Sequence, residues 1–302
     1  MTTSRRAVLT GVLAGVGGAV LACTPSRPDS PGSDAGPADR ATAELGALER
    51  RFGGKLGLFA LDTANGSTVS HRGDERFLMC STVKTFIAAT VLHRRLTEAR
   101  LLDRTIHYTP ADILEWAPVT ATHLYDGMTV AQLCEAMITQ SDNTAANLLI
   151  ATLGGPAVTQ EFVRTLGDNI SRMDRTETAL NYPDGDKDTS TPAQLVSTLT
   201  RVALGDGLDP HGRELLTGWL KANTTGGQTI RAGVPARWTV GDKTGSGFAG
   251  QANDIAVLWP PDRAPIVIAA LTAPDDRASD QGKPTIAEAT RIALRELGTE
   301  PA

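Results

Sequence analysis

Ser81 and Lys84 stand three residues apart in the stretch CSTVK, at the start of a helical pattern. Residues at this spacing share one face of a helix, so the Lys amine could reach the Ser hydroxyl and make it a nucleophile. A Ser at a helix N-terminus also lies near free backbone N–H groups, which could contribute to an oxyanion hole. The alternative is a solvated Lys one turn after a helix cap, and an S-x-x-K spacing alone favours that alternative.

Two further polar stretches could serve the same chemistry. Ser141-Asp142-Asn143 separates two helical stretches, where a short polar triplet usually caps a helix. Glu177 and Asn181 lie four residues apart in a segment whose composition indicates a loop. A carboxylate and an amide in such a loop could hold a water between them. The alternative for this segment is a solvated surface loop.

The stretch GDKTGSGFAG, residues 241–250, can be read in two ways. From Gly245 it fits G-x-G-x-x-G, which in a dinucleotide site follows a strand and opens a helix. The residues after Gly250 read QANDIAVLW, a strand pattern, so the nucleotide interpretation is rejected. From Lys243 the same letters give K-T-G on a strand edge, with glycines that let this edge approach a ligand closely.

Taken together and in this order, the four motifs resemble those of the class A serine β-lactamases. The resemblance covers the chain from about residue 40 to its C-terminus. It implies that Ser81 is the nucleophile, that Lys84 is its activating partner, and that Ser141 passes a proton to the departing ring nitrogen. It also implies that Glu177 and Asn181 hold and activate the water that deacylates the enzyme. The resemblance leaves open whether Lys84 or Glu177 is the base for acylation.

The resemblance also implies a set of substrate-binding groups. Lys243 would supply positive charge for the substrate carboxylate, and the hydroxyls of Thr244 and Ser246 would add hydrogen bonds to it. The backbone N–H groups of Ser81 and Ser246 would form the oxyanion hole. Asn143 would bind the amide of the acyl side chain.

Other residues match the family in structural roles or depart from it. Arg175 and Asp188 match the charged pair that closes the neck of the loop carrying Glu177. Trp116 falls where the family usually has an aromatic wall beside the substrate; its alternative is ordinary packing. Many members carry an Arg on the strand after K-T-G, which is missing here, and Arg277 or Lys283 is the candidate replacement. The segment at 182–187 is two residues shorter than the usual family loop. Ala88 stands where some members have a cysteine bonded to the equivalent of Cys134.

These side chains need a scaffold, and the pattern along the chain predicts one of the α/β class, α+β type. We expect a helix-flanked antiparallel β-sheet built from both chain ends, with an inserted all-α domain. The expected domains are an α/β sheet domain at 40–72 and 214–302 and an all-α domain at 73–213. The expected sheet elements are a helix at 40–52, a hairpin at 54–75 with Asn65-Gly66 at its turn, strands at 237–246, 253–261 and 264–274, and a helix at 283–297.

The N-terminal residues 1–22 have the form of an export signal. Arg5 and Arg6 precede a weakly apolar run, as in a twin-arginine signal, and the run ends at Ala22-Cys23, as in a lipobox. The protein is therefore expected to be exported, either as a lipoprotein on the outer face of the cytoplasmic membrane through Cys23 or as a periplasmic or secreted protein. Residues 23–39 read as a flexible tether.

Composition limits the partners. The net charge of -5 and the lack of a Lys/Arg run beyond the N-terminus argue against nucleic-acid binding, so we expect a small-molecule substrate and a monomer. The five His residues show no metal-binding spacing, so we expect neither a metal nor a cofactor. The sequence alone does not say whether Cys80 and Cys134 pair, but Cys80 lies inside an apolar run, which favours a buried free thiol.

The preferred function is hydrolysis of the β-lactam ring of penicillins and cephalosporins through a Ser81 acyl-enzyme. The nearest alternative is a penicillin-binding D-alanyl-D-alanine peptidase or an acylatable β-lactam sensor, which lacks a base to activate the deacylating water. A second alternative is a non-catalytic binding lipoprotein. Glu177 with Asn181 favours the hydrolase.

Overall fold

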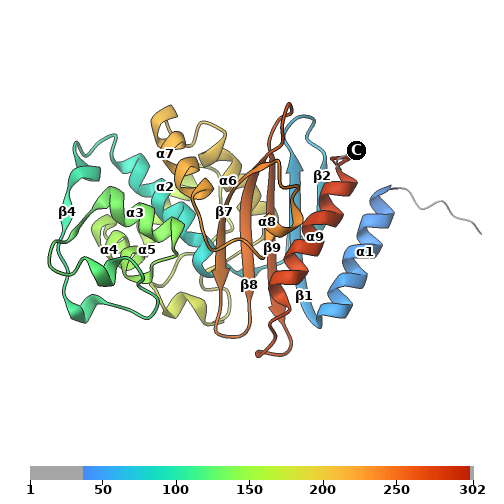
Figure 1. The fold of residues 1–302 in the computed structure, drawn as a ribbon, viewed down its shortest axis with the longest axis horizontal. Helices are drawn as coiled ribbons and strands as arrows, with labels where there is room; N and C mark the ends of the chain where they lie inside the picture. Colours follow the sequence, from blue (N-terminus) through green and yellow to red (C-terminus); the bar gives the residue numbers. More distant parts are fainter. Residues whose placement is uncertain (1–36, 300–302) are drawn as a thin grey trace, which may run out of the picture. The chain divides into compact units, whose positions relative to one another are not determined.

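The computed structural model describes residues 37–299, and its centre is an antiparallel five-stranded sheet (Figure 1). The strand order is β2-β1-β9-β8-β7, so strands from the two ends of the chain lie side by side. β1 pairs with β9 along its whole length, from Gly54 opposite Pro274 to Asp62 opposite Ile266. The strands are β1 (Gly54–Asp62), β2 (Thr68–His71), β7 (Thr239–Ser246), β8 (Ala252–Trp259) and β9 (Ile266–Pro274).

Helices from both chain ends cover one face of this sheet. α1 (Pro37–Phe52), α8 (Ile230–Gly233) and α9 (Gly282–Glu296) lie on the same side of the strands (Figure 1). Ion pairs between Arg51 and Glu288 and between Glu44 and Arg295 join α1 to α9. A buried apolar cluster fills the space between these helices and the strands.

The strand residues alternate between two cores. In β9, Ile266, Ile268 and Ala270 join the cluster beneath α1 and α9, whereas Val267 and Leu271 join the cluster on the opposite face. Successive side chains of a strand point to opposite faces, and a sheet covered on both faces is apolar along its whole strands. This explains why IVIAALTAP reads as a continuous apolar run.

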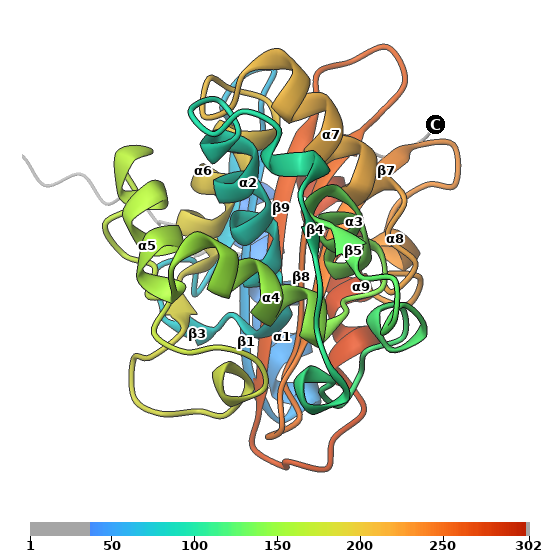
Figure 2. The same cartoon turned by 90° about the vertical axis from the view of Figure 1, so that its left-hand side faces the viewer.

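A block of helices packs on the second face of the sheet and extends away from it. In Figure 2, α3, α4 and α5 lie in front of the strands. Side-chain caps at Thr129, Asp142, Thr191 and Asp209 fix the starts of four of these helices. The block contains α2 (Lys84–Arg94), α3 (Val130–Thr139), α4 (Asn143–Leu153), α5 (Pro156–Thr165), α6 (Pro192–Ala203) and α7 (Pro210–Lys221).

Short elements connect the block to the sheet and to itself. The small strands are β3 (Phe77–Leu78), which pairs with β6 (Thr189–Ser190), and β4 (Thr105–Ile106), which pairs with β5 (Met128–Thr129). The 3₁₀ helices are η1 (Cys80–Val83), η2 (Leu101–Asp103), η3 (Pro110–Asp112), η4 (Thr120–Thr122) and η5 (Ala179–Asn181).

The predicted fold class is confirmed, including the contribution of both chain ends to the sheet. The first helix begins at Pro37, three residues before its predicted start. The export signal at 1–22 and most of the tether lie outside the described residues. The two-domain boundaries stay a prediction, and in residues 37–299 one apolar core runs from the helical block onto the sheet.

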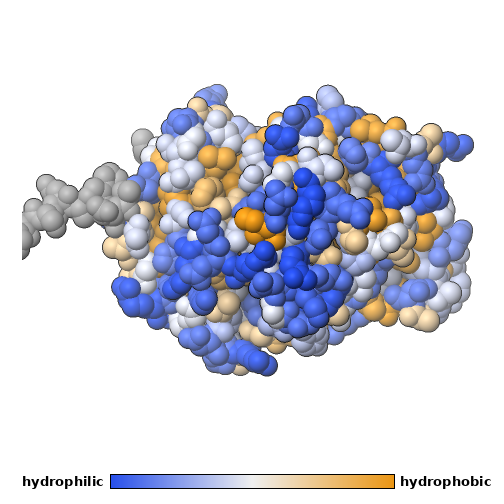
Figure 3. Space-filling model, turned by 180° about the vertical axis from the view of Figure 1, so that it is seen from behind, coloured by the Kyte–Doolittle hydropathy of each residue, from blue (hydrophilic) through white to orange (hydrophobic). Residues whose placement is uncertain are grey.

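The hydropathy of the helices and of the molecular surface is as follows. Between residues 37 and 299, no helix combines the length and apolarity needed to cross a membrane. On the face opposite to that of Figure 1, hydrophilic side chains dominate and the hydrophobic ones form small separated groups (Figure 3).

Candidate active site

Ser81 lies in η1, directly before α2 begins at Lys84. Residues three apart in a 3₁₀ turn eclipse each other, so Ser81 and Lys84 face the same side. Ser81 is 7% exposed and Lys84 is fully buried. The predicted pair therefore shares one face of a buried turn beneath the molecular surface.

The Lys84 amine is held by oxygens from two segments, the Ser141–Asn143 triplet and the loop that carries Glu177. Its Nζ lies 2.8 Å from the Ser141 carbonyl oxygen, 2.6 Å from Asn143 Oδ1 and 2.9 Å from Glu177 Oε1. The Ser141 hydroxyl is 3.3 Å from the same nitrogen. Burial lowers the pKa of Lys84, and the Glu177 carboxylate acts in the opposite direction.

Glu177 connects the Ser and the Lys. The Ser81 hydroxyl donates to Glu177 Oε1 at 3.1 Å, the same oxygen that Lys84 contacts. Asn181 Nδ2 donates to the other carboxylate oxygen at 2.5 Å. Asn181 Oδ1 is buried without a hydrogen-bond partner, so it can accept a bond from a water or a ligand. Among residues 37–299 the hydroxyl of Ser81 bonds to Glu177 and not to Lys84.

The Ser141-Asp142-Asn143 triplet is both a helix cap and part of the site. Asp142 caps α4 by accepting from the Ala145 N–H at 2.9 Å. Ser141, with a left-handed φ of 58°, precedes the cap and turns its carbonyl and hydroxyl toward Lys84. Asn143 also donates from Nδ2 to the Glu115 carbonyl oxygen at 2.8 Å, so its side chain positions Lys84. Its predicted role in binding the substrate amide stays a prediction.

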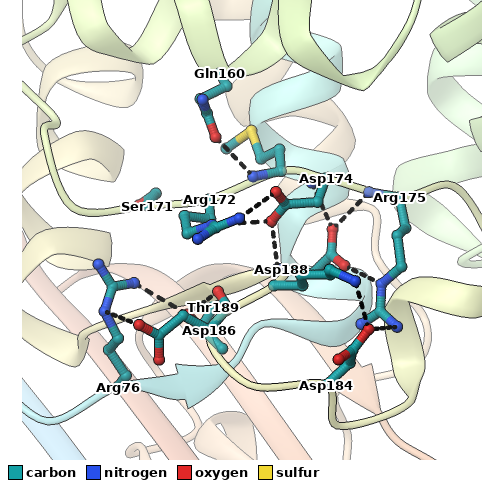
Figure 4. A network of polar contacts seen from close by, with 12 residues as sticks. Arg76, Gln160, Ser171, Arg172, Asp174, Arg175, Asp184, Asp186, Asp188 and Thr189 are labelled. Atoms are coloured by element: carbon teal, nitrogen blue, oxygen red, sulfur yellow. Dashed lines mark hydrogen bonds and ion pairs between the residues drawn. The ribbon is translucent and has the colours of Figure 1, made fainter.

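Figure 4 shows the neck of the loop that carries Glu177. Arg175 Nε lies 2.5 Å from Asp188 Oδ2, as the sequence predicts, and the other oxygen of Asp188 accepts the backbone N–H groups of Asp174 and Arg175. Arg175 also donates to the Tyr182 carbonyl oxygen at 2.7 Å. The Asp188 carbonyl accepts from the Met79 N–H, which ties the neck to the segment that precedes Ser81.

Asn147 is a positioning residue that the sequence motifs missed. Its Nδ2 donates to the Glu177 carbonyl oxygen at 2.7 Å and its Oδ1 accepts from the Glu177 N–H at 2.9 Å. The side-chain amide of Asn147 therefore bonds to both backbone polar groups of Glu177, its N–H and its carbonyl oxygen. Asn147 lies one helical turn after Asn143 on α4, and this spacing was the only signal for it in the sequence.

Lys243 is buried in β7, at the open edge of the sheet. Burial and the nearby Lys84 lower the pKa of Lys243 to about 7. Asp242 and Asp254 act in the opposite direction and favour the charged form of Lys243. Burial raises the pKa of both of these carboxyl groups. The Lys243 Nζ donates to the Thr244 carbonyl oxygen at 2.9 Å. Arg231 and Asn223 bind Asp242, the carboxylate next to Lys243 in sequence.

Gly245 permits a close contact inside the protein. A Cβ at this position would lie 2.9 Å from the Met79 carbonyl oxygen and 3.0 Å from the Ser81 nitrogen. The strand edge thus approaches the backbone of η1, in addition to facing the cavity that a ligand would enter. The strand β8 follows the loop after β7, which agrees with the rejection of a dinucleotide loop.

A cavity of about 370 Å³ opens above these groups. Trp116 lines it and is 63% exposed, as the predicted aromatic wall requires. Lys283 lines it as well, whereas Arg277 does not. The buried residues Lys84, Glu177 and Lys243 are not among those that line it. The other predicted residues on its wall are Ser81, Ser141, Asn143, Asn181, Thr244 and Ser246.

Several residues of the wall belong to no motif. Thr225 faces Thr244, with their hydroxyl oxygens 2.5 Å apart. Glu115, Thr178 and Phe248 also line the cavity. They come from loops whose positions depend on tertiary packing, so the sequence carried no signal for them.

The two cysteines of the described residues are buried and unpaired, which agrees with the buried free thiol favoured for Cys80. Burial raises the pKa of the Cys80 thiol, which keeps it protonated beside the nucleophile. A protonated, buried thiol is a poor nucleophile.

The geometry defines a site for acyl transfer to a serine. Ser81 has a carboxylate acceptor in Glu177, a buried cation in Lys84 beside that acceptor, and a second cation in Lys243, next to Thr244 of the cavity wall. These are the parts needed to form and then break an ester on Ser81.

Comparison with known proteins agrees with this class. The family model described as the beta-lactamase enzyme family matches residues 40–297. A beta-lactamase AST-1 from Nocardia asteroides is 48% identical over 253 residues, covering 83% of this chain and 82% of that protein. A carbapenem-hydrolyzing beta-lactamase KPC from Klebsiella oxytoca is 47% identical over 254 residues, covering 83% and 87%.

Solved structures agree as well. A class A beta-lactamase from Mycobacterium abscessus has a TM-score of 0.85 and 64% sequence identity, covering 85% of this chain and 99% of that one. A beta-lactamase from Desulfarculus baarsii has a TM-score of 0.85 at 46% identity, covering 87% and 99%. The chain belongs to the β-lactamase enzyme family, and the resemblance to its class A members is confirmed.

Proposed function

We propose that this class A enzyme hydrolyses the β-lactam ring of penicillins and cephalosporins through an ester on Ser81. The observation that carries the proposal is the convergence of the Ser81 hydroxyl and the Lys84 amine on one oxygen of Glu177. The relatives named β-lactamases, at 47–48% identity, support the substrate class. The peptidase, sensor and binding-lipoprotein alternatives are not favoured.

In the acylation step Ser81 Oγ attacks the ring carbonyl carbon while Glu177 takes its proton, since the 3.1 Å hydrogen bond already points to that oxygen. The carbonyl oxygen becomes an oxyanion facing the N–H groups of Ser81 and Ser246. The ring C–N bond then breaks, and Ser141 gives its hydroxyl proton to the leaving nitrogen. Lys84 replaces that proton across its 3.3 Å contact with Ser141 Oγ.

Before deacylation Glu177 passes the proton it took from Ser81 to the neutral Lys84 amine, 2.9 Å from its Oε1. A water then attacks the ester carbon and gives a proton to Glu177. The unpartnered Asn181 Oδ1 beside the carboxylate is the second acceptor that would orient this water. The C–O bond to Ser81 breaks, Ser81 recovers its proton, and the ring-opened acid leaves. This step separates a hydrolase from a protein that only becomes acylated.

The substrate carboxylate would bind at Lys243, Thr244 and Ser246. Lys283 is the second cation of this subsite, since it lines the cavity and Arg277 does not. Lys283 thus takes the place of the arginine that many members carry on the strand after K-T-G.

Chromogenic cephalosporin turnover by purified residues 37–302 tests the proposal. Continuous turnover by the wild type, none by Ser81→Ala and a stoichiometric burst by Glu177→Ala are expected. A wild-type protein that gives only a burst would be a penicillin-binding protein or sensor. A burst in Glu177→Ala as fast as wild-type acylation would move the acylation base from Glu177 to Lys84.

We also propose that the protein is exported and anchored by a lipid on Cys23, on the basis of Arg5-Arg6 and the lipobox-like Val20–Cys23. Cells grown with radiolabelled palmitate should label the full chain in the membrane fraction, and Cys23→Ala should abolish the label. Labelling that persists in Cys23→Ala would rule out this anchor.

A further inference from the structure

Asn253 is a buried polar residue that belongs to none of the motifs. It lies in β8, is 1% exposed, and stands directly opposite Gly245 of β7 in the strand register. Its Nδ2 donates to the Leu78 carbonyl oxygen at 2.7 Å and to the Met79 carbonyl oxygen at 3.2 Å. A buried amide that donates to two main-chain carbonyls of another segment restrains both peptide groups. Asn253 therefore ties the sheet to the segment that leads to Ser81.

The Asn253 side chain is itself held by β9. Its Oδ1 accepts from the Thr272 N–H at 3.1 Å. The Thr272 hydroxyl donates to the Ala252 carbonyl oxygen at 2.7 Å and accepts from the Ala252 N–H at 2.9 Å. The Asn253 amide thus uses its acceptor on one strand and its donors on the segment before the nucleophile. A side chain with partners on both sides cannot rotate without breaking one of these bonds.

The backbone before Ser81 needs such support because it is strained. Cys80 has a left-handed φ of 49°, a conformation that is costly for a residue with a Cβ and persists only when its surroundings hold it. Met79, directly before Cys80, donates its N–H to the Asp188 carbonyl oxygen at 2.9 Å, and its own carbonyl accepts from Asn253. These bonds restrain the peptide groups on both sides of Met79, so they limit where Cys80 turns the chain and where the Ser81 N–H points.

Asn253 also restrains the nucleophile turn relative to the sheet. The Met79 carbonyl accepts from the Thr82 N–H at 3.3 Å and from the Thr82 hydroxyl at 2.8 Å, but these bonds lie within the turn and would move with it. The bond from Asn253 joins the same carbonyl to β8, the strand that pairs with β7. Because β7 carries Ser246 and η1 carries Ser81, this bond bears on the separation of the two N–H groups that would form the oxyanion hole.

We propose that Asn253 is a positioning residue for acylation, which holds the Met79 carbonyl so that the N–H groups of Ser81 and Ser246 converge on one oxyanion. The inference rests on the proposed function and adds to it a residue that acts through the backbone, since Asn253 is not among the residues that line the cavity. Donors held in place stabilise the charge that develops on the substrate carbonyl, and a displaced donor stabilises it less.

The test measures the ester carbonyl of the acyl-enzyme, whose stretching frequency rises when the hydrogen bonds to its oxygen weaken. Glu177→Ala accumulates this ester with benzylpenicillin under the proposed function, and infrared difference spectra with an isotopically labelled ring carbonyl identify its band. Adding Asn253→Ala to this background should move the band to higher wavenumber and slow formation of the ester about 10- to 100-fold. Asn253→Leu, which keeps most of the side-chain volume, should give the same two changes and serves where Asn253→Ala does not fold.

Thr272→Val is the matched control. It removes two buried hydrogen bonds to Ala252 and keeps the backbone N–H that Asn253 contacts, so it perturbs the same strands without releasing Met79. In the Glu177→Ala background it should lower the melting temperature and leave both the carbonyl band and the rate of ester formation unchanged.

The outcomes separate this inference from the proposed function. An unchanged carbonyl band in a folded Asn253 variant would overturn the inference, because the residue would then only stabilise the fold. An equal band shift in Thr272→Val would also overturn it, since a packing defect anywhere on these strands would suffice. A wild-type protein that neither hydrolyses benzylpenicillin nor forms an ester with it would instead refute the proposed function.

Discussion

Lys243 is a buried cation whose nearest charged neighbours act on it in opposite directions. Burial and Lys84 favour its neutral form, while the carboxyl groups of Asp242, Asp254 and Glu177 favour its charged form. The balance leaves the pKa of Lys243 at about 7, so a change of pH near neutrality changes the charge of the group that we propose binds the substrate carboxylate.

We therefore expect kcat/KM for carboxylate-bearing β-lactams to fall as the pH rises through about 7. The sign follows because the folded pKa of Lys243 is below its usual value, so the ammonium loses its proton in that range and carboxylate binding weakens. In Lys243→Arg the guanidinium stays charged, and the decline should move to higher pH. The measurement is the pH profile of kcat/KM between pH 5 and 10 for both proteins.

A substrate ester provides the control for Lys243. With the methyl ester of the same β-lactam, no decline near pH 7 is expected, since there is no carboxylate to bind. A decline of the same size with the ester would assign the titration to another group, such as Lys84.

At the scale of elements, the close approach of β7 to η1 sets the spacing between the nucleophile and the strand. Gly245 makes this approach possible because the Met79 carbonyl and the Ser81 nitrogen leave no room for a Cβ. Both neighbours are backbone atoms, so they cannot rotate away as a flexible side chain would.

Gly245→Ala is expected to push β7 away from η1 and displace Ser246, which lines the cavity together with Ser81. A shift of this kind should lower kcat/KM by roughly 10- to 100-fold, because misplacement by about 1 Å can cost about 100-fold. The matched control is Gly218→Ala in α7, where nothing lies within 4 Å of the added carbon. That variant should keep full activity, and equal losses in the two variants would contradict this account.

At the scale of the whole described chain, the sheet separates two apolar cores with different relations to the site. The core beneath α1 and α9 lies on one face of the sheet, whereas the groups on Ser81, Lys84 and Ser141 belong to the helical block beyond the other face. Packing defects in the first core should therefore act on stability before they act on catalysis.

Leu45→Ala tests this separation, because Leu45 in α1 is fully buried in the first core. The free energy of unfolding should fall by about 2–5 kcal/mol, while kcat/KM below the melting temperature stays within twofold of wild type. Urea unfolding followed by circular dichroism measures the first value. Leu96→Ala, at a 54% exposed position, should change stability little. A large loss of activity in folded Leu45→Ala would show that the two cores are coupled.

The sequence alone determined most of the elements and predicted the reacting groups through the family motifs, because both depend on local order. Apolar strand runs, the caps and the S-x-x-K, S-D-N and K-T-G spacings are properties of short segments. The strand pattern after Gly250 was enough to reject a nucleotide loop. The fold class and the neck pair Arg175–Asp188 were therefore predictable from the family motifs.

The tertiary structure alone decided which atoms meet. Ser81, Ser141 and Glu177 are distant in sequence, so only folding shows that the Ser81 hydroxyl reaches Glu177 directly and that Lys84 joins the same oxygen. Asn147 and Asn253 carry no motif, since their roles depend on contacts between separate segments. The charge of Lys243 was equally hidden, because a pKa depends on burial and on neighbours that folding brings together.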